Sequence, residues 1–111
     1  MTEQGYRLFY RITKSNPPSV GDFQSAKSRG APMPQDANRL AVWDELSVYS
    51  TMSQARRKRR TSPILGRYIV VLRVPIDGSV RIERTLRDPG RHTIWEEAAV
   101  VRTWMVSVEP A

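Results

Sequence analysis

The sequence predicts an α+β fold: a small, mainly antiparallel sheet of about five strands with two to four short helices packed on it. Short segments that alternate apolar and polar residues, as half-buried strands do, are separated by turns rich in proline and glycine. One segment, 67–74, is apolar on both faces in its middle, which is typical of a central strand covered on both sides. We therefore expect 67–74 to be the core of the sheet.

Length and composition predict a single domain that spans 1–111. A chain of 111 residues is too short for two units with separate cores. Hydrophobic residues make up 40% of it, which is enough to build a core and argues against disorder.

The first expected strand is 6–12, where apolar side chains recur at a period of two. One face carries Tyr6, Leu8, Tyr10 and Ile12. The opposite face carries Arg7, Phe9 and Arg11. Two prolines at 17 and 18 end the strand, because proline cannot donate to a ladder.

Two helices and a strand are expected next. Ser19 or Asp22 can cap a short helix that runs to about residue 28. A second helix is expected at 35–45, and the alternation of 46–50 indicates a short strand.

A third helix is expected from Thr51 to the proline at 63. Thr51 and Gln54 fit a capping box, in which the hydroxyl accepts from the Gln54 backbone and the glutamine side chain reaches back. The stems of Arg56 and Arg59 are expected to cover apolar surface. The cations expected to face water are Arg57, Lys58 and Arg60.

The remaining elements follow from turns and alternation. A turn after 67–74 leads to 79–84, which we expect to pair with 67–74 as an antiparallel hairpin. Beyond a glycine turn at Gly90, Thr93 and Glu96 repeat the capping-box pattern ahead of a brief helix over 97–101. The last expected strand, 103–108, has one face formed by Trp104, Val106 and Val108.

The charge of the chain indicates an anionic partner. Eighteen Lys and Arg against eleven Asp and Glu give a formal charge of +7, and three of the cations are lysines. Guanidinium groups suit phosphates and carboxylates, so we expect a non-enzymatic module that recognises nucleic acid or an acidic protein surface through an arginine-rich helix. The residues expected to bind the polyanion are Arg56, Arg57, Lys58, Arg59, Arg60 and Arg67. A solvated helix face that keeps the protein soluble is the alternative interpretation.

Some chemistries are excluded or disfavoured by composition. The chain has no cysteine and one histidine, so thiolate and multi-histidine metal sites are excluded, and we expect no metal and no cofactor. The polar N-terminus and the lack of a long apolar run predict a soluble cytoplasmic protein without a membrane anchor. The best acid/base candidates are Glu96 and Glu97 beside His92 and Trp95, because an adjacent indole raises the pKa of a carboxyl by desolvation.

Two resemblances extend these expectations. The segments 6–8, 22–25, 46–49, 54–56, 65–69 and 91–95 resemble a family of small uncharacterised bacterial proteins, and this resemblance implies no activity. The order of chemical groups also resembles the ADP-ribosyltransferase-like layout, which implies an NAD-handling enzyme. That resemblance places the catalytic groups at Arg7, Tyr49 or Ser50, and Glu96 or Glu97. A third hypothesis is a structural or regulatory subunit whose exposed aromatic residues pack on a partner.

Overall fold

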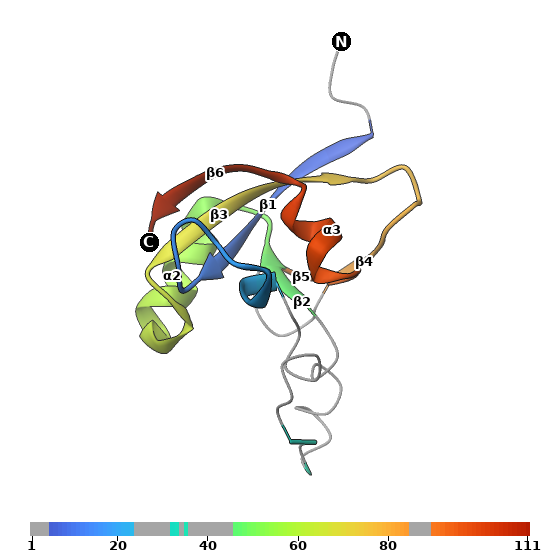
Figure 1. Ribbon diagram of the computed structural model, residues 1–111. Coiled ribbons are helices and arrows are strands. Elements are labelled where there is room, and N and C mark those ends of the chain that lie inside the picture. Colours follow the sequence, from blue (N-terminus) through green and yellow to red (C-terminus); the bar gives the residue numbers. More distant parts are fainter. Residues whose placement is uncertain (1–4, 24–31, 34, 36–45, 85–89) are drawn as a thin grey trace.

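Six strands form one antiparallel sheet in a computed structural model of the protein, in the order β4-β5-β2-β1-β3-β6 (Figure 1). The structure describes residues 5–23, 32, 33, 35, 46–84 and 90–111. The strands are β1 (Tyr6–Thr13), β2 (Leu46–Tyr49), β3 (Tyr68–Pro75), β4 (Arg81–Arg84), β5 (Arg91–Trp95) and β6 (Met105–Pro110). The helices are α2 (Met52–Thr61) and α3 (Ala98–Arg102), with 3₁₀ turns η1 (Val20–Phe23) and η2 (Pro63–Leu65). The predicted α+β fold with an antiparallel sheet is confirmed, and the sheet has six strands where about five were expected.

Strand β3 is the central element, as its sequence predicts. It pairs along its whole length with β1 on one side, and from Tyr68 to Leu72 with β6 on the other. Val70, Leu72 and Ile69 are fully buried, although Ile69 points to the face opposite to the other two. Both faces of the sheet are therefore covered where β3 runs, as its apolar sequence predicts.

The larger core lies on one face of the sheet. It is formed by Phe9, Phe23, Leu46, Val48, Val70, Leu72, Val74, Ile94 and Val101. Phe23 belongs to η1 and Val101 to α3, so these two elements cover this face. Figure 1 shows α3 and α2 on opposite sides of the central strands.

The burial of β1 differs from a simple alternating strand. Phe9, from the face that also carries two arginines, is 1% exposed, whereas Tyr6 and Leu8 on the other face are 45% and 44% exposed. The reason is the short reach of α2, which covers the Tyr10 and Ile12 end of that face and leaves the Tyr6 end open.

A smaller core joins α2 to the opposite face. Ile12, Tyr49 and Ile69 of the sheet pack against Ala55, which is fully buried, and Met52 lies against this cluster. The helix thus contributes its few apolar residues to the sheet and directs its cations elsewhere.

The predicted hairpin between 67–74 and 79–84 is wrong. Strand β4 pairs with β5 at the far edge of the sheet, with Ile82 opposite Ile94. Both edges of β3 are already occupied by β1 and β6, so no edge is left for β4.

Two predictions for the C-terminal third also need correction. Thr93 is not a helix cap, because it is 2% exposed inside β5, and α3 begins after Glu97 with no side-chain cap. In β6 an irregularity opposite Val71 and Leu72 shifts the register, so Val106 is 59% exposed while Val108 packs on the larger core.

The earlier helices can be assessed in part. The first is limited to the single turn of η1 where it is described, and its continuation to residue 28 lies outside the described residues. The expected helix at 35–45 also falls outside them, apart from residue 35. In the part of the chain that the structure describes, no helix is long and apolar enough to span a membrane.

Asp22 fastens the loop between β1 and η1. Its carboxylate accepts bonds from the Lys14 amide, the Ser15 hydroxyl and the Ser19 amide at 2.5–3.0 Å, and its carbonyl accepts from Arg11 Nε at 2.7 Å. Partial burial by itself raises the pKa of the Asp22 carboxyl, but the hydrogen bonds from these neighbours outweigh it and lower the pKa below 3.8.

We expect Asp22→Ala to lower the free energy of unfolding by about 1–2 kcal/mol near neutral pH, because three donors lose a charged acceptor. A carboxyl with a lowered native pKa stabilises the fold fully above its unfolded pKa and loses that effect as pH falls through the native value. Urea unfolding should therefore show the difference from wild type shrinking below pH 3.8. Asp77→Ala is the control, because Asp77 bonds only within its own turn, to Ser79, among the described residues. Equal stability of Asp22→Ala and wild type at neutral pH would contradict this role.

Candidate functional site

The arginine-rich helix α2 is fixed at both ends by local hydrogen bonds. Thr51 is its N-cap and accepts from the Gln54 amide at 3.1 Å, as the capping box predicts. The Gln54 side chain does not complete the box, because its oxygen accepts from the Ser50 hydroxyl at 2.7 Å. The helix ends at Thr61, where the Ser62 amide bonds to the Lys58 carbonyl and the following proline prevents further helix.

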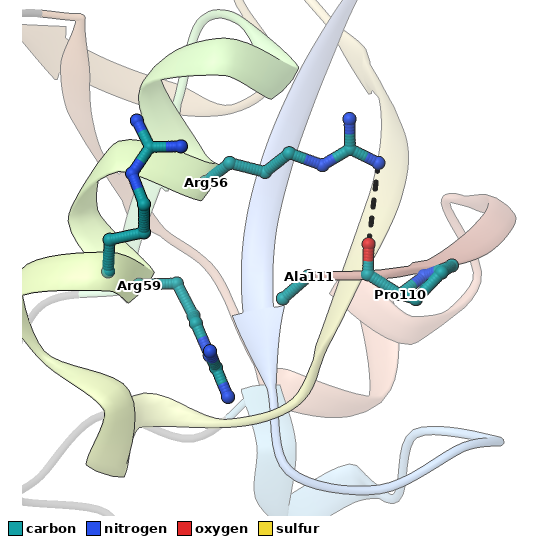
Figure 2. A pocket seen from close by; sticks show the side chains of 5 residues that line it. Arg56, Arg59, Pro110 and Ala111 are labelled. Carbon is teal, nitrogen blue, oxygen red and sulfur yellow. Dashed lines mark hydrogen bonds between the residues drawn. The ribbon is translucent and has the colours of Figure 1, made fainter.

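Three arginines of α2 line one cavity. Arg56, Arg59 and Arg60 are spaced by three and four residues, so they lie on the same side of the helix. Together with Pro110 and Ala111 at the end of β6, they line an open cavity of about 350 Å³. Figure 2 shows Arg56 extending from α2 to the end of β6, whereas Arg59 leaves the helix in a different direction.

Backbone carbonyls orient two of these guanidinium groups. Arg56 donates from Nη2 to the Pro110 carbonyl at 3.4 Å, and Arg59 donates from Nε to the Gly66 carbonyl at 3.1 Å (Figure 2). Each group uses one nitrogen in this way and keeps its others for a ligand. The carbonyls therefore fix the orientation of the two guanidinium groups while leaving donors available.

The three charged residues that line the cavity are all cations. Among the residues that the structure describes, no carboxylate forms an ion pair with Arg56, Arg59 or Arg60. Like charges four residues apart, such as Arg56 and Arg60, repel and destabilise a helix by about 0.2–0.5 kcal/mol per pair. Cations in the last turn are partly compensated by the helix dipole. An anion in the cavity would relieve the remaining repulsion.

The structure divides the six cations that the sequence singles out. Arg56 and Arg59, whose stems were expected to cover apolar surface, both line the cavity together with Arg60. Arg57 is exposed and Lys58 half-buried, and neither lines the cavity. Arg67 is exposed beside it, since its carbonyl accepts from the Ala111 amide at 2.9 Å. The sequence carries no signal for the contribution of Pro110 and Ala111, because they meet α2 only through the sheet.

The groups expected for NAD chemistry are not brought together. Tyr10 lies opposite Tyr49 in the sheet, and the two side chains share one face. Arg7 is three residues from Tyr10 on the same strand, so its side chain lies on the opposite face. Tyr49 is 5% exposed under α2. The register puts Glu96 roughly 25 Å from Arg7 along the strand direction, at the other end of the sheet.

The acid/base candidates around His92 are likewise not gathered in one site, and most of them already contact other groups. His92 Nδ1 lies 3.0 Å from the Gly90 carbonyl, and its ring meets Phe9 edge-on at 5.1 Å. Glu96 and Glu97 are exposed between β5 and α3, with the Glu96 carboxylate accepting from the Glu97 amide. The indole of Trp95 is covered by Arg81 at 3.9 Å. Over the described ranges, no group of three metal-ligating side chains occurs.

Comparisons with protein-family models, with curated proteins and with solved structures find no match for this chain. Its resemblance to a family of small bacterial proteins and to the ADP-ribosyltransferase-like layout stays a prediction.

Gly66 connects the site to the sheet, and we expect Gly66→Ala to destabilise the protein by more than about 2 kcal/mol. Its φ of 149° is unfavourable for other residues, and an added methyl group would overlap the Thr13 carbonyl. Because Gly66 also accepts from Arg59, the cavity should be disturbed as well. Gly78→Ala is the control in urea unfolding: Gly78 has a positive φ of 96° but open space around it. Equal losses for both variants would contradict a steric role for Gly66.

Proposed function

We propose that this protein is a small basic binding module that recognises a polyanion, either nucleic acid or an acidic protein surface, through α2. The observation that supports the proposal is that Arg56, Arg59 and Arg60 line one open cavity and that none of them has a carboxylate partner among the described residues. Charged groups are costly to crowd together unless a counter-charge joins them. An anionic ligand supplies that counter-charge.

The chemistry of the donors favours oxyanions. Guanidinium groups present planar pairs of N–H donors that match the oxygen atoms of phosphates and carboxylates. With two guanidinium groups already oriented by carbonyls, less conformational entropy is lost on binding. The net charge of +7 adds a long-range attraction that raises the association rate at low salt.

The NAD-handling alternative gains no support from the geometry. Arg7 and Tyr49 lie on opposite faces of the sheet, and the two glutamates lie at its other end. We therefore argue for binding, with Arg57 and Arg67 widening the surface around the cavity.

Removing the cavity charges should weaken binding and its salt dependence. We expect the triple variant Arg56→Gln, Arg59→Gln, Arg60→Gln to lower the slope of log affinity against log salt by about 2 for a single-stranded oligonucleotide, because each phosphate contact contributes about 0.7. The measurement is fluorescence anisotropy over a salt series, with a polyglutamate chain in parallel to separate nucleic acid from acidic protein.

The matched control removes the same charge elsewhere. Arg7→Gln, Arg84→Gln and Arg102→Gln are exposed positions outside α2 and should affect binding much less. If both triple variants lose affinity equally, net charge rather than α2 is responsible. If wild type binds neither ligand at low salt, the proposed function is wrong.

A further inference from the structure

We propose that the 3₁₀ turn η2 is a contact site at which apolar side chains of an acidic protein partner cover Ile64 and Leu65. This inference rests on the proposed polyanion binding and narrows its ligand to an acidic protein segment. The turn follows directly after α2, to which it is joined through Ser62 alone. A partner on the arginine-rich helix is therefore also within reach of η2.

The apolar residues of η2 are exposed as a continuous run. Ile64 is 82% exposed, the highest value among the large hydrophobic side chains that the structure describes, and Leu65 is 38% exposed. Pro63 before them is exposed as well. Single apolar residues are common on protein surfaces, whereas three in succession are unfavourable in water unless a partner covers them. The turn is therefore a place where a partner gains binding energy from apolar contact.

Hydrogen bonds fix the conformation of η2. The Leu65 amide donates to the Ser62 carbonyl at 3.1 Å, and the Gly66 amide donates to the Pro63 carbonyl at 3.3 Å. Gly66 lies so close to the Thr13 carbonyl that a Cβ would overlap it. A contact site that is ordered before binding loses less conformational entropy when a partner docks. The turn thus presents its side chains in a defined position.

The charge around η2 favours an acidic partner. Arg60 precedes the turn and Arg67 follows it, and both are exposed. In the part of the chain that the structure describes, neither forms an ion pair with a carboxylate. A second copy of this chain would bring the same cations and its own net charge of +7 against them. Carboxylates around an apolar centre complement the turn, because rim charges steer and position a partner while the apolar centre supplies affinity.

The aliphatic character of η2 favours a protein over other polyanions. Unpaired bases are bound by stacking on aromatic side chains, and η2 has none. A phosphate backbone offers no apolar surface to Ile64 and Leu65. An anionic lipid surface does, but these two side chains have less apolar area than a myristoyl chain, which by itself gives only marginal membrane binding. An acidic protein segment supplies both the carboxylates and the apolar side chains.

Two synthetic peptides with identical glutamate spacing test the apolar contact. The residues between the glutamates are leucine in one peptide and serine in the other, so length and charge are the same. By fluorescence anisotropy in about 0.15 M salt, we expect wild type to bind the leucine peptide about tenfold more tightly, because covering Ile64 removes apolar area from water. This ratio should persist in about 0.5 M salt, where screening weakens the binding of both peptides.

Matched serine variants locate the contact. Ile64→Ser removes the most exposed side chain of η2, so the preference for the leucine peptide should fall to about twofold or less. Ile76→Ser makes the same substitution at a position that is 48% exposed and outside η2, and it should keep the preference. Both variants should unfold within about 4 °C of wild type, because the replaced side chains are exposed. A larger loss in Ile64→Ser would assign this residue to the fold and overturn the contact site.

The peptide results separate this inference from the proposed function. A preference lost in Ile64→Ser and kept in Ile76→Ser supports the contact site. Equal binding of the two peptides, or a preference that Ile64→Ser keeps or that both variants lose, overturns it. The polyanion module then still stands if the triple glutamine variant of α2 lowers the salt slope. Absence of binding to both peptides and to the oligonucleotide at low salt overturns both proposals.

Three further measurements expose a different occupant of η2. Ile64→Ser is compared with wild type for binding to the single-stranded oligonucleotide, for binding to phosphatidylserine vesicles, and for mass by sedimentation equilibrium. A loss of oligonucleotide or vesicle binding as large as the loss for the leucine peptide assigns the turn to that ligand. A wild-type dimer that Ile64→Ser converts to a monomer assigns it to a second copy of the chain. Each of these results overturns the acidic protein as the partner, and three unchanged values support it.

Discussion

The structure depends on the burial of β3 between β1 and β6. Its apolar side chains fill both faces of the sheet, and each fully buried Val, Leu or Ile contributes about 1.5–3 kcal/mol. The same strand positions the candidate site, because Gly66 and Arg67 lead into its start and β6 runs beside it to Pro110. A change that loosened β3 would therefore separate α2 from the end of β6 and open the cavity.

Helix α2 combines two opposing demands. Ala55 and Met52 hold it on the sheet, while Arg56, Arg59 and Arg60 place three positive charges within two turns of the helix. The cap at Thr51 and the helix dipole offset part of that repulsion. Under the proposed function, a bound anion would offset the remaining repulsion and stabilise the protein by linkage.

Local physics explains which elements could be predicted. The strands β1, β2 and β3, the Thr51 cap and the stop before Pro63 follow from alternation, capping and proline geometry, and each is present. The predictions that 79–84 pairs with β3 and that Thr93 caps a helix were wrong. Both outcomes depend on pairing between segments that are distant in the sequence. Both β1 and β6 compete successfully for the edges of β3, and β5 extends through the segment that resembles a capping box.

By itself, the sequence determined the central strand, the arginine-rich helix and its start and end. Only the tertiary structure decided which arginines line a common cavity. A run of five cations on a helix has no defined partner until another element lies against one side of it, and that element is the end of β6, brought there by its pairing with β3. Long-range strand pairing converts a local excess of charge into a cavity lined by Arg56, Arg59 and Arg60.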